Sequence, residues 1–274
     1  MGQISNSGAS QTDDTMNNAS LVLLQIEDGI ALLTLNNPAR MNAVDQHMAR
    51  ALAACVQTIA TSQTARVVIL RAAGHAFCAG GDIAAMQARR GDLHGFITET
   101  IDPFHEAILG LRRLRAPVIA CVQGAAAGGG FSLAMACDIV LAATSARFVV
   151  AYPKLGAPAD GGLSFSLVQR LGAVRGFEAL TIGGSYDAPR ALELALVNAV
   201  ANDADLEATA LEWARRLLAL APQSLSELKS LVAAQSTDAF AEHLMREKAA
   251  FLRCVAAPEF LARVDAFIQK TRPA

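Results

Sequence analysis

The sequence is poor in aromatic residues and has almost no net charge. Aromatic residues make up 5% of the 274 residues, with a single tryptophan, while 53% of the residues are hydrophobic. The core must therefore be built mostly from aliphatic side chains and alanine, and a chain of this length can bury it without staples. The formal net charge of −2 argues against a nucleic-acid partner and against binding to a membrane surface.

Cysteine is also scarce, and none of the five cysteines forms a C-x-x-C pair. Three of them lie within apolar runs, where a reduced cysteine acts as a small hydrophobic residue. This pattern is typical of a cytoplasmic protein. No metal centre is expected either, because the histidines show no metal-ligand spacing. They are His47, His75, His94, His105 and His243.

Glycine motifs that bind nucleotide phosphates are missing as well, since neither G-x-G-x-x-G nor G-x-x-x-x-G-K occurs. The longest apolar run, residues 117–143, is long enough to suggest a membrane span. It contains Gln123, Ser132 and Asp138, however, and glycines interrupt it. We therefore expect a buried strand, turn and helix there, and no membrane association.

Three parts are predicted along the chain. Residues 1–20 are polar and predict a disordered tail. Residues 21–200 alternate strand and helix patterns, which predicts an α/β core, and residues 201–274 form a helical C-terminal region. The predicted strands lie at 21–36, as a hairpin turning at Asp28-Gly29, and at 65–73, 116–124 and 139–150. Helices are predicted at about 41–60 and 83–115, near Gly130, and from Ala173 onward.

Two segments share one pattern: a buried strand, a loop of small residues and the start of a helix. They are RVVILRAAGHAFCAGGDI (66–83) and APVIACVQGAAAGGGFSLAMACDI (116–139). Small residues let a ligand approach the backbone, and free N–H groups at a helix start favour negative charge. Two such loops side by side can present two N–H groups to one oxygen, as in an oxyanion hole. Each loop alone could equally be a tight turn that uses small residues for packing.

Together these loops closely resemble the enoyl-CoA hydratase/isomerase family, also called the crotonase family. LNNPARMNAVDQHM and LGAPADGGLSFSLVQRLGAVRGFEALTIGGSYDAPRALELALVNAV extend the likeness from about Leu21 to the C-terminus. The resemblance implies an α/β fold, a crotonase-type spiral of ββα units whose helical C-terminal region supports trimers or dimers of trimers. It implies an acyl-CoA thioester as substrate, with no separate cofactor.

The resemblance also implies the groups that stabilise the oxyanion of the thioester. Carried over by position, the first backbone donor falls on Ala79, with Gly81 as the alternative, and the second falls on Gly129. Arg40, Lys270 and Arg272 are candidates to contact the CoA phosphates. The remaining binding residues assigned by position are Cys78, Gly81, Asp82 and Tyr152, and the acyl pocket is expected along residues 95–114.

The sequence departs from the hydratases of this family at two positions. Those enzymes resemble one another in having two glutamates, where this chain has Ser132 and Tyr152. Hydration needs one group to activate water and another to deliver a proton. Asp160 instead matches the aspartate of enoyl-CoA isomerases, including the ring-epoxide/enoyl-CoA isomerases of the phenylacetate pathway. A double-bond shift with Asp160 as acid and base is therefore predicted.

The sequence leaves three further interpretations of the site open. Asp160 also matches the nucleophile of 4-chlorobenzoyl-CoA dehalogenases, a reaction that needs a histidine, for which His94 is the candidate. Those enzymes have tryptophan where this chain has Tyr152. The second reading is a hydratase with non-standard bases, and the third is a non-catalytic acyl-CoA binder. Asp160 itself could be a simple turn or helix-cap residue.

Overall fold

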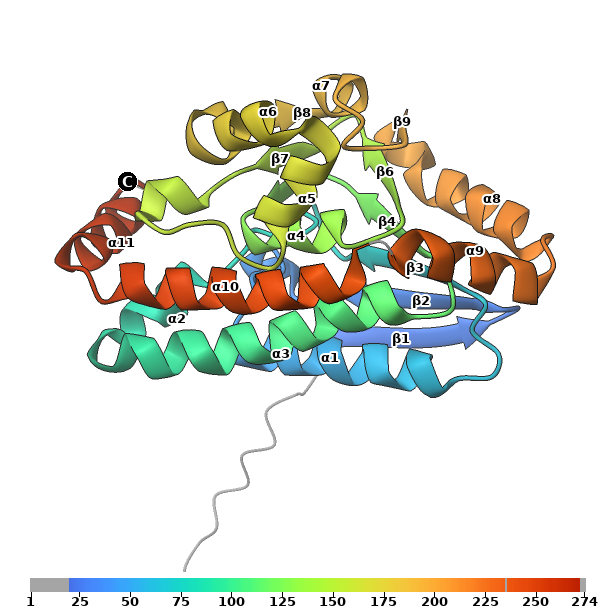
Figure 1. Ribbon diagram of the computed structural model, residues 1–274, viewed down its shortest axis with the longest axis horizontal. Helices are drawn as coiled ribbons and strands as arrows, with labels where there is room; N and C mark the ends of the chain where they lie inside the picture. The colour runs from blue at the N-terminus through green and yellow to red at the C-terminus, as the bar shows by residue number, and fades with distance from the viewer. Residues whose placement is uncertain (1–19, 235, 272–274) are drawn as a thin grey trace, which may run out of the picture.

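The computed structural model describes residues 20–234 and 236–271 (Figure 1). The predicted polar tail, apart from Ser20, lies outside the described residues, and so does Arg272. Within the described ranges no helix is both long enough and apolar enough to cross a membrane. The apolar run at 117–143 instead folds as strands and a short helix.

The described residues contain two sheets. The larger has the strand order β1-β2-β3-β4-β6-β9 and the smaller the order β5-β7-β8. In the larger sheet β1 and β2 are antiparallel and all other neighbours are parallel. The strands are β1 Val22–Glu27, β2 Ile30–Leu35, β3 Val67–Ala72, β4 Val118–Val122, β5 Ala125–Ala127, β6 Ile139–Ala143, β7 Arg147–Val149, β8 Ser185–Asp187 and β9 Ala199–Ala201.

Helices follow most strands and make up the C-terminal part. The α-helices are α1 Gln46–Thr61, α2 Ile83–Ala88, α3 Leu93–Arg113, α4 Gly129–Met135, α5 Leu163–Leu171, α6 Ala173–Glu178, α7 Ala188–Glu193, α8 Leu206–Leu218, α9 Pro222–Ala234, α10 Thr237–Val255 and α11 Pro258–Thr271. Short helical turns are η1 Pro38–Arg40, η2 Arg90–Asp92, η3 Tyr152–Leu155, η4 Ala179–Gly183 and η5 Asp203–Asp205. Aspartates cap several of the helices, as Asp45 does for α1 by accepting from two backbone N–H groups.

The predicted hairpin is confirmed, with β1 and β2 joined through Asp28 and Gly29 at φ 51° and 83°. Two expectations were incomplete. The region expected to be helical after Ala173 also contains the strands β8 and β9, and part of the expected glycine loop forms β5. Each of these strands has only three residues, too few for an alternating pattern to appear in the sequence.

The larger sheet is covered on both faces. Along β3, Val68 and Leu70 belong to the main core, to which α1 and α3 contribute. Val67 and Ile69 point the other way and join a second core under α8. This alternation follows from the two-residue period of a strand, and it explains why β3 is apolar at every one of these positions.

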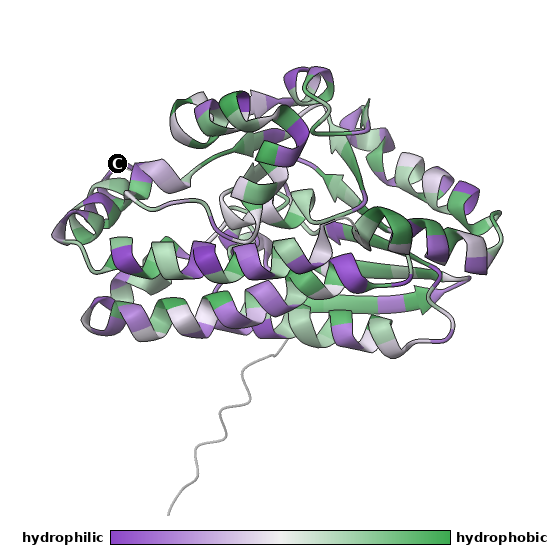
Figure 2. Ribbon diagram, in the orientation of Figure 1, coloured by the Kyte–Doolittle hydropathy of each residue, from purple (hydrophilic) through white to green (hydrophobic). Residues whose placement is uncertain are grey.

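Helices α3 and α10 lie side by side along one edge of the molecule (Figure 1). Both present mixed hydrophilic and hydrophobic residues in Figure 2, as expected for helices with one buried face. The buried residues of α10 recur at helical spacing and are Phe240, Leu244, Glu247, Phe251 and Val255. Glu247 is the charged member of this otherwise apolar face.

Candidate active site

The two small-residue loops identified in the sequence lie against each other. The N–H group of Cys78 donates to the carbonyl oxygen of Ala125 at 2.9 Å, and the N–H of Ala127 donates to the carbonyl of Cys78 at 2.9 Å. A Cβ atom added to Gly80 would lie 2.5 Å from the carbonyl oxygen of Ala127. Only glycine fits there, and its φ of +89° also favours glycine.

In the first loop, the N–H group of Gly81 is free to meet a ligand and that of Ala79 is not. Ala79 donates to the carbonyl oxygen of Met41 at 2.9 Å. The carbonyl oxygen of Gly80 accepts from the N–H of Val44, and the N–H of Asp82 donates to the carbonyl oxygen of Val44. In this parallel pairing the N–H of Gly81 points away from Val44. The assignment of the first donor to Ala79 therefore conflicts with the structure, and Gly81 takes its place as the candidate.

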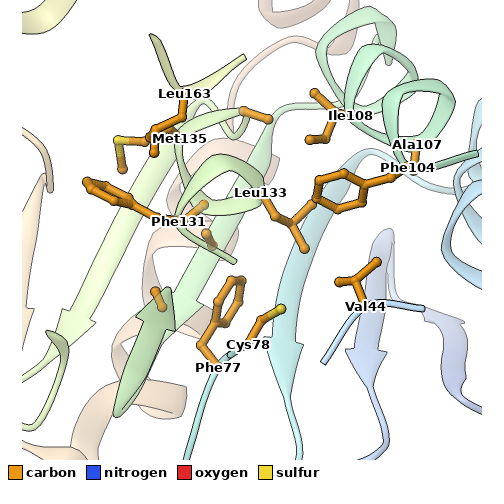
Figure 3. Close-up of a cluster of buried hydrophobic side chains, with 14 of the residues drawn as sticks. Val44, Phe77, Cys78, Phe104, Ala107, Ile108, Phe131, Leu133, Met135 and Leu163 are labelled. Atoms are coloured by element: carbon orange, nitrogen blue, oxygen red, sulfur yellow. The ribbon is translucent and has the colours of Figure 1, made fainter. Parts of the chain in front are cut away.

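In the second loop, Gly129 is the first residue of α4, and N–H groups in a first helical turn have no partner within the helix. The neighbouring Gly130 allows the two loops to approach closely, because a Cβ there would lie 2.2 Å from the carbonyl oxygen of Cys78. Beneath them, Phe77 and Cys78 join Phe131 and Leu133 in the buried cluster of Figure 3.

Gly81 and Gly129 line one cavity of about 70 Å³ together with Asp160. The wall is mostly apolar, and five of its residues come from α3, within the segment expected to hold an acyl chain. They are Phe96, Ile97, Thr100, Ile101 and Phe104. The ionisable side chains among the lining residues are Asp82, Tyr152 and Asp160. A pocket with an apolar wall and a few convergent polar groups is typical of a small-molecule site.

Asp160 is buried, with 4% of its surface exposed, and its backbone carbonyl is held by two hydroxyl groups. Ser132 donates to this carbonyl oxygen at 2.6 Å and Tyr152 at 3.0 Å. The two hydroxyl oxygens are themselves 3.0 Å apart. Ser132 and Tyr152 occupy the positions where the resemblance places glutamates in hydratases. Here both residues anchor the loop that carries Asp160.

Tyr152 remains a protonated donor in this arrangement. Burial raises the pKa of its hydroxyl well above the usual value, and the neighbouring Asp160 carboxylate raises it further. The phenol therefore cannot supply a base near neutral pH. Its proton is donated to the carbonyl oxygen of Asp160.

A histidine that sequence reasoning missed holds the carboxylate of Asp160. Nε2 of His105, on α3, lies 2.9 Å from Oδ1 of Asp160, a distance at which the ring N–H donates to the carboxylate. His94, the histidine that the sequence offered for dehalogenation, is exposed on the same helix. The available signal was helical spacing, since His105 follows the buried Ile101 by four residues.

The sequence profile of enoyl-CoA hydratase/isomerase matches residues 25–274. The chain belongs to this family. It is 31% identical to the 1,2-epoxyphenylacetyl-CoA isomerase of Escherichia coli over 92% of this chain and 97% of that protein. It is 34% identical to a probable enoyl-CoA hydratase of Mycobacterium tuberculosis over 66% of this chain and 70% of the other.

The fold of the family is shown by solved structures. The crystal structure of an enoyl-CoA hydratase from a Polaromonas species covers 92% of this chain and 98% of its own, with 34% identity and a TM-score of 0.73. That of an enoyl-CoA hydratase from Mycobacterium avium subsp. paratuberculosis covers 91% of this chain and 100% of its own, with 27% identity and a TM-score of 0.81. The α/β crotonase fold with a helical C-terminal region, expected from the sequence, is thereby confirmed.

Of the other residues assigned to binding, Asp82 lines the cavity and Lys270 does not. Arg40 pairs with Asp82, with Nη1 3.0 Å from Oδ2, and Asp82 also caps α2 through the N–H of Ala85. Lys270 is exposed in the last turn of α11. Both terminal nitrogens of the half-exposed Arg40 face the Asp82 carboxylate, so contact with a phosphate group stays a prediction for Arg40.

Cys78 is fully buried behind the first loop. Burial raises the pKa of its thiol to about 12, so the reactive thiolate is absent at neutral pH. We expect Cys78 in the folded protein to resist iodoacetamide at about pH 8 and to react once the protein is unfolded. Peptide mapping by mass spectrometry checks this. Rapid labelling of Cys78 in the native state would contradict the buried, unreactive role.

Proposed function

We propose that the protein is an enoyl-CoA isomerase that moves the double bond of a 3-enoyl-CoA thioester to the 2-position. The observation that carries the proposal is a buried carboxylate, Asp160, that opens onto the same cavity as Gly81 and Gly129. One carboxylate is sufficient for an isomerase, because it removes a proton at one carbon and returns it at another.

The proposed reaction begins at the thioester. Its oxygen accepts hydrogen bonds from the N–H groups of Gly81 and Gly129, which stabilise the charge that develops on it. Asp160 removes the proton alpha to the thioester, and the electron pair of that C–H bond delocalises into a dienolate. Asp160 then returns the proton to the gamma carbon as the new double bond forms between the alpha and beta carbons. His105 donates to Oδ1, which leaves Oδ2 to exchange the proton.

The same geometry argues against hydration as the main activity. Water addition needs two proton-transfer groups, and the hydroxyls of Ser132 and Tyr152 are already hydrogen-bonded to the Asp160 carbonyl. Among the cavity-lining carboxylates, Asp82 is bound by Arg40 and by the start of α2. Asp160 is the carboxylate that remains.

The test compares two substrates with purified protein. Incubation with a 3-enoyl-CoA and, separately, with a 2-enoyl-CoA is followed by chromatographic separation of the thioesters. We expect conversion of the first to 2-enoyl-CoA and little 3-hydroxyacyl-CoA from the second. Rapid hydration of the second substrate without isomerisation of the first would overturn the proposal in favour of a hydratase with other bases. No turnover of either would favour an acyl-CoA binder.

The cavity size predicts a preference for short acyl chains. Its volume of about 70 Å³ is well below the roughly 300–1,000 Å³ of sites that hold drug-sized ligands. Phe251 of α10 forms part of its wall, so Phe251→Ala enlarges it. We expect kcat/KM for an eight-carbon relative to a four-carbon 3-enoyl-CoA to rise about tenfold, the effect of roughly one to two added methylenes. Competition assays measure the ratio. An unchanged ratio would show that the acyl chain does not lie against Phe251.

A second candidate function is favoured by the contact between His105 and Asp160. Hydrolytic dehalogenation of an aromatic acyl-CoA requires a carboxylate nucleophile and a histidine that activates water against the resulting ester. His94, the candidate from sequence, is exposed, whereas His105 lies beside Asp160. Release of chloride from 4-chlorobenzoyl-CoA would support this function. If no chloride is released, dehalogenation is excluded.

We also propose that the protein is a cytoplasmic homotrimer or dimer of trimers, as the family resemblance implies. Exposed apolar side chains on α9 support self-association, with Leu231 and Val232 66% and 73% exposed. Light scattering on the purified protein decides the oligomeric state. A monomer at micromolar concentration would contradict this proposal.

A further inference from the structure

The loop that carries Asp160 leads directly into α5, and this helix begins without a capping side chain of its own. The residue before the helix is Gly162, at φ 79°, and it follows Gly161, at φ 67°. A Cβ on Gly162 would lie 2.2 Å from Cζ of Phe240 on α10. The two glycines are therefore required by the turn, and the loop depends on α10 for part of its packing.

The missing cap is supplied by Glu247 of α10. Its Oε2 accepts a hydrogen bond from the N–H of Gly162 at 2.6 Å, and its Oε1 accepts one from the N–H of Ser164 at 3.1 Å. The hydroxyl of Ser164 also donates to Oε1. With 5% of its surface exposed, Glu247 is buried. The backbone donors and the positive end of α5 compensate its charge.

The Asp160 loop is thus fixed from two sides. On one side, Ser132 and Tyr152 hold the carbonyl of Asp160. On the other side, Glu247 holds the N–H of Gly162, two residues later. We propose that Glu247 is a positioning residue for the catalytic base, an inference that rests on the proposed role of Asp160. Through this contact, α10 determines where the carboxylate of Asp160 lies in the cavity.

This role predicts a defined kinetic effect. In Glu247→Ala, the start of α5 loses its acceptor, and a displacement of the base by about 1 Å lowers kcat for 3-enoyl-CoA roughly a hundredfold. KM should change little, since the thioester is held by the two loops. Glu247→Gln keeps one acceptor oxygen for two N–H groups, so its kcat should lie between those of the wild type and the alanine variant.

The matched control is Lys248→Ala, which changes the next residue on α10. Lys248 pairs with Asp102 of α3, so the variant weakens the packing of α10 against α3 without removing the cap of α5. Thermal unfolding of each variant shows how much stability it has lost. We expect Lys248→Ala to keep kcat within about twofold of the wild type, as is usual for a change at an exposed pair.

A double variant separates positioning from general destabilisation. In the Asp160→Asn background no base remains to be displaced, so adding Glu247→Ala should lower the residual rate no further although it still lowers the unfolding temperature. Loss of stability with unchanged kcat in Glu247→Ala would overturn the inference and leave the isomerase proposal intact. Equal losses of kcat in Lys248→Ala and Glu247→Ala would overturn it as well.

If the wild type does not isomerise 3-enoyl-CoA, the proposed function fails, and a second assay decides the inference separately. Exchange of the alpha protons of a saturated acyl-CoA with D₂O, followed by NMR, needs only the base and the oxyanion donors. Exchange that depends on Asp160 and slows in Glu247→Ala supports the positioning role. Exchange that is independent of Glu247 overturns it.

Discussion

Replacing Asp160 by asparagine is expected to lower kcat for the 3-enoyl to 2-enoyl conversion about a thousandfold, within the range for loss of a general acid–base group. Asparagine keeps the size of the side chain and an oxygen for His105, but its amide cannot take up the alpha proton. KM should stay close to the wild-type value, since the thioester donors are untouched. The rate is measured from the absorbance of the conjugated product.

The stability of this variant provides the control. Asp160 is buried beside an apolar wall, so removing its charge should not lower the unfolding temperature. A normal melting curve with a thousandfold slower reaction therefore identifies a chemical role. If Asp160→Asn retained more than about a tenth of the wild-type kcat, another residue would have to be the base.

Gly130→Ala is expected to produce the second large effect, on both activity and stability. The new Cβ would lie 2.2 Å from the carbonyl oxygen and 2.8 Å from the Cβ of Cys78. Both atoms are buried, so the loops must separate, which costs about 1–3 kcal/mol of unfolding free energy. Separation moves the N–H groups of Gly81 and Gly129 apart, and loss of one such donor lowers kcat about 10²–10³-fold.

Gly91→Ala serves as the comparison for this variant. Gly91 has no atom within 4 Å of an added Cβ, and its φ is not in the left-handed region. We expect wild-type kcat and an unfolding free energy within about 0.5 kcal/mol of wild type. Chemical denaturation and the same absorbance assay measure both quantities. Unaltered activity in Gly130→Ala would show that the spacing of the two loops is not needed for the reaction.

The parts of this site that depend on local pattern could be predicted from the sequence. Strand, small-residue loop and helix start are visible from residue type and spacing, whereas Asp160 was identified through the family resemblance. The identity of the first donor was not visible in this way. Whether Ala79 or Gly81 has a free N–H depends on the pairing of the loop with Met41 and Val44, which are distant in the chain.

Contacts between distant segments account for the other omissions. His105 and Asp160 are 55 residues apart, and Gly162 and Glu247 are 85 apart. Hydrophobic periodicity places His105 and Glu247 on the inward faces of their helices, but it gives no partner for either. A single sequence therefore predicts that a polar residue is buried, whereas the packing of α3 and α10 determines what that residue does.

The hydroxyl pair of Ser132 and Tyr152 has a consequence for attempts to redesign this enzyme. Installing glutamates at both positions, the obvious route toward a hydratase, also removes the anchor of the Asp160 carbonyl. The first engineered step would therefore disrupt the proposed isomerisation before the new reaction could work. A workable route must first provide the loop with a different support, and the Glu247 side of α5 is the side that such substitutions leave intact.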